Sequence, residues 1–280
     1  MSFSIRPFTE HDVAAALRLC RSAGWNQLDS DWSRLIRYEP DGCWVAEVGS
    51  RLVGTVTTTR YGQHLAWIGM MLVDPEYRRR GIATALINTS IQYLQRLRIP
   101  CIKLDATPEG KPVYERLGFQ TEWSYRRWQC ELAPQRDDSV DGKAQTPMPS
   151  PSLRSAAASL DLQAFGVDRL DWIDRLGKDS STCFRVGGWG MIRAGHLAHY
   201  LGPLVAANAS MASTIVDELL SQTAARVFWD VPQPNANAVR LAEQRGFVAV
   251  RDLERMWLGQ PLITPPQVDL QYAICDPGTG

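Results

Sequence analysis

The feature that most constrains this chain is an order of secondary-structure elements that occurs twice. Up to residue 132 the apolar pattern predicts a strand, two helices, three strands, a long helix, a strand, a short helix and a final strand. After residue 152 it predicts helix, hairpin, strand, helix, strand, helix and strand. The stretch 133–152 between them is rich in Pro, Ser and charge. We therefore expect two related α/β domains joined by a linker.

Two landmarks align the halves. A strand running into proline occurs at 72–75 and at 200–203, and a helix followed by Gly-Phe ends at Phe119 and at Phe247. The proline and that glycine are 43 positions apart in each half, from 75 to 118 and from 203 to 246. The intervening Asp105 and Asp230 fall 30 and 27 positions after the prolines, so the equal spacing hides a shorter helix region and a longer loop. Internal duplication is the economical explanation.

The composition is that of an ordinary globular protein. Of the 280 residues 45% are hydrophobic, and 30 Lys and Arg balance 30 Asp and Glu, which argues against a nucleic-acid partner. The sequence shows neither a secretory leader nor an apolar run long enough to span a bilayer, so we expect a cytoplasmic protein with no membrane partner. Its six cysteines lack any metal-ligand spacing, and no metal site is expected.

Three consecutive arginines precede a predicted helix over 82–97. Arg78, Arg79 and Arg80 are followed by Gly81, which permits a close approach of the main chain. The first amides of a helix lack intrahelical partners and face the positive end of its dipole. The segment therefore predicts a cradle for an anion such as a diphosphate, with a solvated surface turn as the alternative.

These residues carry a family resemblance. The segment Arg78-Arg79-Arg80-Gly81-Ile82-Ala83 matches the acetyl-CoA loop pattern Gln/Arg-x-x-Gly-x-Gly/Ala of the GNAT superfamily of N-acetyltransferases, and YERLGF at 114–119 matches a companion signature. The whole chain resembles tandem-GNAT enzymes with a diverged second half. The resemblance implies an α/β (α+β) fold of two GNAT-like domains, each with a mixed, mostly antiparallel sheet flanked by helices. It places a catalytic domain at 1–132, a linker at 133–152 and a degenerate domain at 153–280.

The resemblance implies acetyl-CoA as co-substrate and direct attack by the amine in a ternary complex. It assigns cofactor contacts to Met71, Leu72, Val73, Arg78, Arg79, Arg80, Gly81, Ile82, Ala83 and Thr84. It also places Tyr114 at the position of the general acid, and a phenol suits that role because it is neutral at pH 7. The alternative for Tyr114 is an aromatic residue that packs into the core.

The general base is left open. Many GNAT enzymes have a glutamate on the fourth strand, but this strand, 65–73, contains none. The weak candidates are Glu47, Asp105 and His64, each of which has a plain structural explanation as a strand, turn or surface residue. A chain of water molecules is an equal alternative.

The second half lacks the features that define the first. Aligned on proline, 206–211 (AANASM) replaces the arginine segment, and aligned on Gly-Phe, Ala242 replaces Tyr114. We expect one acetyl-CoA site, in a monomer or homodimer, with a small-molecule amine as acceptor. The alternatives are a protein N-terminal or lysine acetyltransferase, an acyltransferase for longer chains, and a non-catalytic acyl-CoA-binding sensor.

Overall fold

The computed structural model describes residues 2–132 and 149–280. The chain forms two compact units, and neither is one continuous stretch of sequence. Unit 1 contains Met1–Glu122, Arg255–Leu262 and Pro277–Gly280, and unit 2 contains Trp123–Glu254 and Ile263–Asp276. The domain limits at 132 and 153 stay a prediction, and positions 133–148 of the predicted linker lie outside the described residues. None of the helices in the described ranges has the length and hydropathy of a membrane span.

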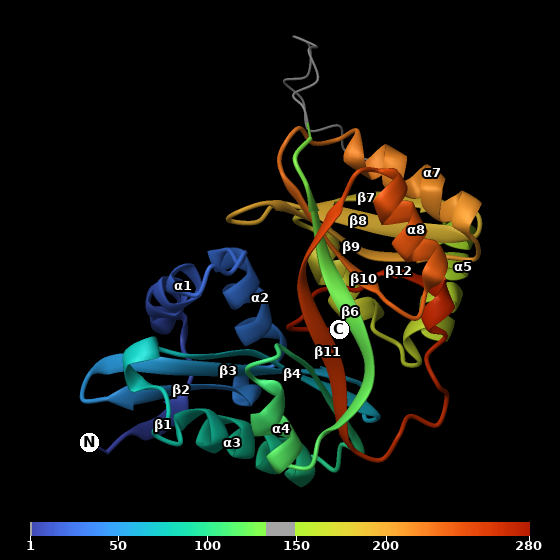
Figure 1. The fold of residues 1–280 in the computed structure, drawn as a ribbon. Coiled ribbons are helices and arrows are strands. Elements are labelled where there is room, and N and C mark those ends of the chain that lie inside the picture. Colours follow the sequence, from blue (N-terminus) through green and yellow to red (C-terminus); the bar gives the residue numbers. More distant parts are fainter. Residues whose placement is uncertain (1, 133–148) are drawn as a thin grey trace. The chain divides into compact units, whose positions relative to one another are not determined.

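Unit 1 is a mixed sheet with helices on both faces. In spatial order its strands are β1 (Ser4–Pro7), β2 (Cys43–Val48), β3 (Arg51–Tyr61), β4 (Leu65–Val73), β5 (Cys101–Ala106) and the end of β11 (Val248–Gly259). The first four pair antiparallel, and β4 pairs with β5 in parallel. Helices α1 (Val13–Ser22) and α2 (Asp29–Tyr38) cover one face, and α3 (Ile82–Arg96) and α4 (Lys111–Arg116) lie on the other (Figure 1). This is the mixed, mostly antiparallel α/β architecture that the sequence predicts.

The core of unit 1 lies between the sheet and α3. The helix buries its apolar stripe at Ile82, Leu86, Ile87, Ile91 and Leu94. Helical spacing predicts Ala83 on this face with the last four, but Ala83 is only partly buried and Ile82 takes its place in the core. Gly54 on β3 leaves room for two of these side chains, because a Cβ there would lie 3.1 Å from Leu86 and 3.2 Å from Ile82. The register of α3 against β3 and β4 is thus fixed by close packing.

Unit 2 repeats the plan with different bounds. Its strands are β6 (Gln120–Cys130, from Trp123 onward), β10 (Val227–Pro232), β9 (His199–Ala206), β8 (Gly188–Arg193) and β7 (Ser180–Arg185) in spatial order, with β12 (Gln271–Ala273) also paired to β9. Its helices are α5 (Pro151–Phe165), α6 (Leu170–Gly177), α7 (Ala209–Leu220) and α8 (Ala236–Gln244). The apolar pattern predicts one helix over 160–179, and this prediction is wrong: the region contains the end of α5 and then α6, because Gly166 at φ 90° ends α5.

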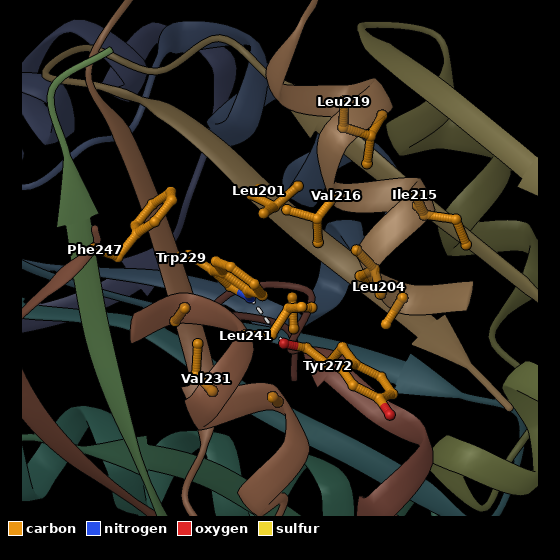
Figure 2. Packing of buried hydrophobic residues seen from close by; sticks show 14 of the residues in the cluster. Leu201, Leu204, Ile215, Val216, Leu219, Trp229, Val231, Leu241, Phe247 and Tyr272 are labelled. Carbon is orange, nitrogen blue, oxygen red and sulfur yellow. Dashed lines mark hydrogen bonds between the residues drawn. The ribbon is translucent and has the colours of Figure 1, made fainter. Parts of the chain in front are cut away.

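A second hydrophobic core fills unit 2 (Figure 2). The buried residues labelled there are Leu201, Leu204, Ile215, Val216, Leu219, Trp229, Val231, Leu241, Phe247 and Tyr272. The one polar group of Trp229 is satisfied, because its Nε1 donates to Tyr272 O at 2.8 Å. The sequence assigns four tryptophans of the second half to a core; Trp172, Trp189 and Trp229 are buried, whereas Trp257 is only half-buried.

The last strand of each repeat contributes to the unit of the other repeat. β6 supplies Arg127, which donates to both carboxylate oxygens of Asp230 in unit 2 at 2.8 and 2.7 Å. β11 supplies Arg255, which donates to both oxygens of Asp105 in unit 1 at 3.0 Å. Both aspartate side chains are completely buried. A buried carboxylate without its partner is strongly destabilising, so each unit depends on the arginine from the exchanged strand.

Candidate active site

β4 leaves its parallel neighbour partway along unit 1. It pairs with β5 only where 65–67 lie beside 101–103, and beyond this point the two strands separate. The separation coincides with a bulge on the β3 side, since Thr57 pairs with Gly69 but Thr55 pairs with Leu72. Two β4 residues thus oppose one on β3, and Met70 takes a positive φ of 51°. The bulge turns main-chain groups of β4 out of the ladder, beside the opening between the strands.

The loop from β4 to α3 places main-chain amides at the helix start. The Asp74 carboxylate accepts from Glu76 N at 3.0 Å and fixes a short 3₁₀ turn over Pro75–Tyr77. Two left-handed residues follow, Arg79 at φ 60° and Gly81 at φ 80°. Gly81 is the N-cap, and within the described part of the chain no side chain caps the first amides of α3. These amides therefore keep their capacity to bind an anion.

The three arginines surround this helix start with positive charge. Arg78 Nε donates to Val73 O at 3.2 Å, and Arg80 Nη2 donates to Glu76 O at 3.0 Å. The Arg80 guanidinium also lies 5.1 Å from the centroid of the Tyr77 ring. All three arginine side chains are exposed. Exposed, partly oriented guanidinium groups beside uncapped amides fit a phosphate-bearing ligand.

Tyr114 lies on α4 in an apolar environment. It is half-buried, meets Phe119 edge to face at a centroid distance of 6.1 Å, and packs against the same core as Met71 and Val73 of β4. Burial raises the pKa of Tyr114 to about 12, because the phenolate would be poorly solvated. The side chain therefore stays protonated across the ordinary pH range.

The three candidate bases lie in different environments. Glu47 on β2 accepts from Arg6 Nη2 at 2.5 Å, and Asp105 is held by Arg255. His64 is exposed in the turn that precedes β4, six residues before Met70. An extended strand rises about 3.3 Å per residue, so His64 is roughly 20 Å from the bulge along β4. In the described ranges no group of three or more His, Cys, Asp or Glu is placed to hold a metal ion.

Two features of unit 1 escaped prediction from the sequence. One is Arg255, whose strand carries no motif of its own; the signal is that Arg127 and Arg255 each stand eight residues after the phenylalanine of a Gly-Phe landmark. The other is the segment Pro277–Gly280, which has no recognisable pattern and packs on β4.

Comparisons with known proteins place both halves of the chain in the same family. The model described as "Acetyltransferase (GNAT) family" matches residues 10–119, and that described as "Acetyltransferase (GNAT) domain" matches 157–272. The uncharacterised N-acetyltransferase YitH of Bacillus subtilis is 26% identical over 245 residues, which cover 85% of each chain. The chain belongs to the GNAT acetyltransferase family and is built from two GNAT domains in tandem.

Solved structures share the full two-domain plan. A candidate acetyltransferase of Pyrococcus horikoshii is 25% identical and superposes with a TM-score of 0.84, over 99% of this chain and 96% of that one. A tandem GNAT protein from the clavulanic acid biosynthesis pathway has a TM-score of 0.67 over 92% and 98% of the two chains, and at 15% identity it shows the fold alone.

Proposed function

We propose that unit 1 transfers an acetyl group from acetyl-CoA to a primary amine of a small molecule. The observation that carries the proposal is the coincidence, in one unit, of a splayed and bulged β4 with an uncapped, arginine-flanked helix start. The diphosphate of CoA suits the amides at 81–84 and the guanidinium groups, since the small side chain of Ala83 leaves the first helical turn uncluttered. Met71, Leu72 and Val73 would hold the pantetheine arm through their main-chain groups.

Proximity supplies much of the rate in this scheme. β4 orients the thioester so that the amine attacks its carbonyl carbon directly, and the carbon–sulfur bond then breaks. Tyr114 donates a hydrogen bond to the departing sulfur as charge develops there. With a pKa of about 12 it is a weaker acid than a thiol of pKa about 8.5, so it stabilises the sulfur first and gives up its proton only late.

Water is the proposed acceptor of the amine proton. Glu47 and Asp105 each bind an arginine, and a carboxylate in such a pair gives up charge-assisted hydrogen bonds if it takes a proton. His64 lies at the far end of β4. A chain of water molecules from the bulge to bulk solvent accepts the proton without breaking the hydrogen bonds of Glu47 or Asp105.

The decisive experiment follows CoA release with a panel of amines for the wild type and for Tyr114→Phe. We expect turnover to fall about a hundredfold or more in the variant, while acetyl-CoA binding measured by calorimetry stays unchanged. Tyr93→Phe is the matched control, because this tyrosine of α3 donates to Glu39 in the interior and should affect stability alone.

The panel also separates the alternative functions. It contains linear and aromatic amines, peptides with a free N-terminus and peptides with an internal lysine, each tested with acetyl-CoA and octanoyl-CoA. Preference for peptides would replace the small-molecule acceptor, and preference for octanoyl-CoA would replace the acetyl group. Binding of acetyl-CoA without turnover of any amine would support the non-catalytic sensor.

A further inference from the structure

The segment Pro277–Gly280 touches β4 beside the bulge. A Cβ on Gly69 would lie 2.2 Å from Gly278 O and 2.7 Å from its Cα, so the two main chains are in contact and only glycine fits at position 69. Gly69 directly precedes Met70, the residue of positive φ. The segment therefore reaches β4 at the point where this strand has just separated from β5.

The contact lies on the sheet face opposite α3. Ala66 and Ile68 belong to the core that α3 covers. Side chains alternate along a strand, so Trp67 and Gly69 point to the other face, which α1 and α2 cover. In the proposed reaction CoA is held on the α3 side by its phosphates, and this opposite face is left for the acceptor.

The segment is firmly held in that position. Tyr61 Oη donates to Thr279 O at 2.5 Å, and Trp67 Nε1 donates to Pro277 O at 3.3 Å. Gly280 lies against the Trp67 ring, where a Cβ would come within 2.7 Å of a ring carbon. Thr279 is only 2% exposed. The segment is thus a built-in part of this face.

Two buried hydroxyls on the same face lack partners. Thr57 and Thr59 are completely buried, and neither Oγ1 has a hydrogen-bond partner among the residues that the structure describes. The strand register places Thr57 opposite Gly69 and Thr59 opposite Trp67. Buried hydroxyls are nearly always hydrogen-bonded, so these two require water or a polar group of a bound molecule.

Two cations beside Trp67, Lys103 and Arg255, already bind carboxylates. Lys103, which pairs in register with Trp67, forms an ion pair with Glu122 at 2.6 Å, and Asp105 binds Arg255. Neither cation is thus placed to receive a carboxylate of the acceptor. What the face offers is hydroxyl groups and carbonyl oxygens, which suit an N–H donor.

From these contacts we infer that Pro277–Gly280 forms the acceptor wall: it closes the α1–α2 face of β4 next to the thioester and restricts the acceptor to short primary amines without a carboxylate. The inference rests on the proposed acetyl transfer. It makes the segment a determinant of specificity and of water exclusion, with Thr57 and Thr59 as polar contacts for the amine or for the water that it displaces.

A chain ending at Asp276 tests the wall. Linear primary amines from ethylamine to octylamine serve as probes, together with hydrolysis of acetyl-CoA in the absence of amine. Removing the wall should raise kcat/KM for octylamine and the hydrolysis rate each about tenfold, which is the scale of the lost contacts, while acetyl-CoA affinity is unchanged. The intact chain should prefer the shorter amines.

Milder variants cover the case in which the shortened chain does not fold. Tyr61→Phe removes one hydrogen bond to the segment and should produce the same two changes at about two- to threefold. Thr57→Val should raise KM for ethylamine, whereas the control Thr58→Val, which loses a bond to Gly42 O on the opposite face, should not.

The outcomes separate the two proposals. Suppose that Tyr61→Phe or the shortened chain binds acetyl-CoA and matches the intact chain in hydrolysis rate and in dependence on amine length. This result would refute the acceptor wall but not the proposed acetyl transfer. Absence of acetyl-CoA binding to the intact chain overturns both. Longer amines preferred by the intact chain would also overturn the wall.

Discussion

Unit 1 and unit 2 both splay their central strands, but only unit 2 fills the opening with another strand. β9 pairs with β10 at 199–201 and 227–229 and then separates from it, as β4 does from β5. β12 enters beside β9 at Leu204 and Val205, and Ile274 N donates to Asp230 O of β10 at 3.2 Å. In unit 1 no described strand other than β3 and β5 pairs with β4.

The N-termini of the corresponding helices, α3 in unit 1 and α7 in unit 2, also differ. In unit 2 the side chain of Asn208 accepts from Met211 N at 2.9 Å and so occupies an amide of α7. In unit 1 the N-cap is Gly81, which has no side chain to offer. The fold that the two units share is therefore not sufficient for the proposed anion site. Unit 1 combines an open splay with uncapped helix amides, whereas in unit 2 the splay holds β12 and Asn208 caps the helix.

The largest effect is expected when the second repeat is removed, because unit 1 then lacks part of its sheet. A fragment of residues 1–132 lacks Arg255 and the Pro277–Gly280 segment. Asp105 therefore loses its ion-pair partner, and the α1–α2 face of β4 loses the segment that packs on it. We expect this fragment not to fold, as judged by amide dispersion in NMR and by the absence of a cooperative melting transition. Adding residues 133–280 in trans should restore folding. Cooperative melting of the fragment by itself would contradict the dependence on exchanged strands.

The next test breaks each exchanged ion pair in turn. Arg255→Leu leaves Asp105 buried without its arginine, and Arg127→Leu does the same to Asp230. Each should cost about 3–5 kcal/mol of unfolding free energy, measured in urea. The double variant Asp105→Leu/Arg255→Leu is the control and should recover much of the loss. A cost below about 1 kcal/mol in either unit would show that its pair is solvated.

A smaller effect is expected at the proposed cradle. Arg78→Ala together with Arg80→Ala should weaken acetyl-CoA binding about tenfold or more, because two charge-assisted contacts are lost. Asn208→Ala in unit 2 is the contrasting variant. It should cost about 1 kcal/mol of stability through its lost helix cap and leave acetyl-CoA affinity unchanged. Equal affinity of the double arginine variant and the wild type would remove the cradle.

The smallest expected effect is on the pH profile. Tyr114 must be protonated to donate to the sulfur, and its pKa of about 12 lies far above neutrality. The rate should therefore show no decline from this group between about pH 8 and 10, and the profiles of the wild type and Tyr114→Phe should be parallel there. A decline in the wild type alone would show that the tyrosine titrates in that range.

Local pattern predicted much of unit 1. The helix expected over 82–97 is α3 at Ile82–Arg96, and the loop from Arg78 to Gly81 stands at its start. Such features depend on neighbours within a few positions, through helical periodicity and glycine conformation. In the same way, the absence of arginines from 206–211 was visible from the sequence alone.

Contacts between distant residues were not predicted. The sequence suggests a turn residue or a base at Asp105, but its environment is set by an arginine 150 positions later. β12 and the Pro277–Gly280 segment have no periodicity, and their places are fixed by backbone contacts with β9 and β4. The sequence does not reveal that the last strands are exchanged, because the residue patterns of β6 and β11 would suit a strand in either unit.

The exchanged strands also delay the completion of unit 1 during synthesis. Arg255 follows Asp105 by 150 residues, which at about 5–20 residues per second separates them by roughly 8 to 30 s on the ribosome. During that interval the N-terminal sheet has an unpaired edge at β5 and a carboxylate that water must solvate. The sheet of unit 1 therefore stays incomplete until Arg255 has been synthesised, a period in which chaperones and neighbouring nascent chains have access to that edge.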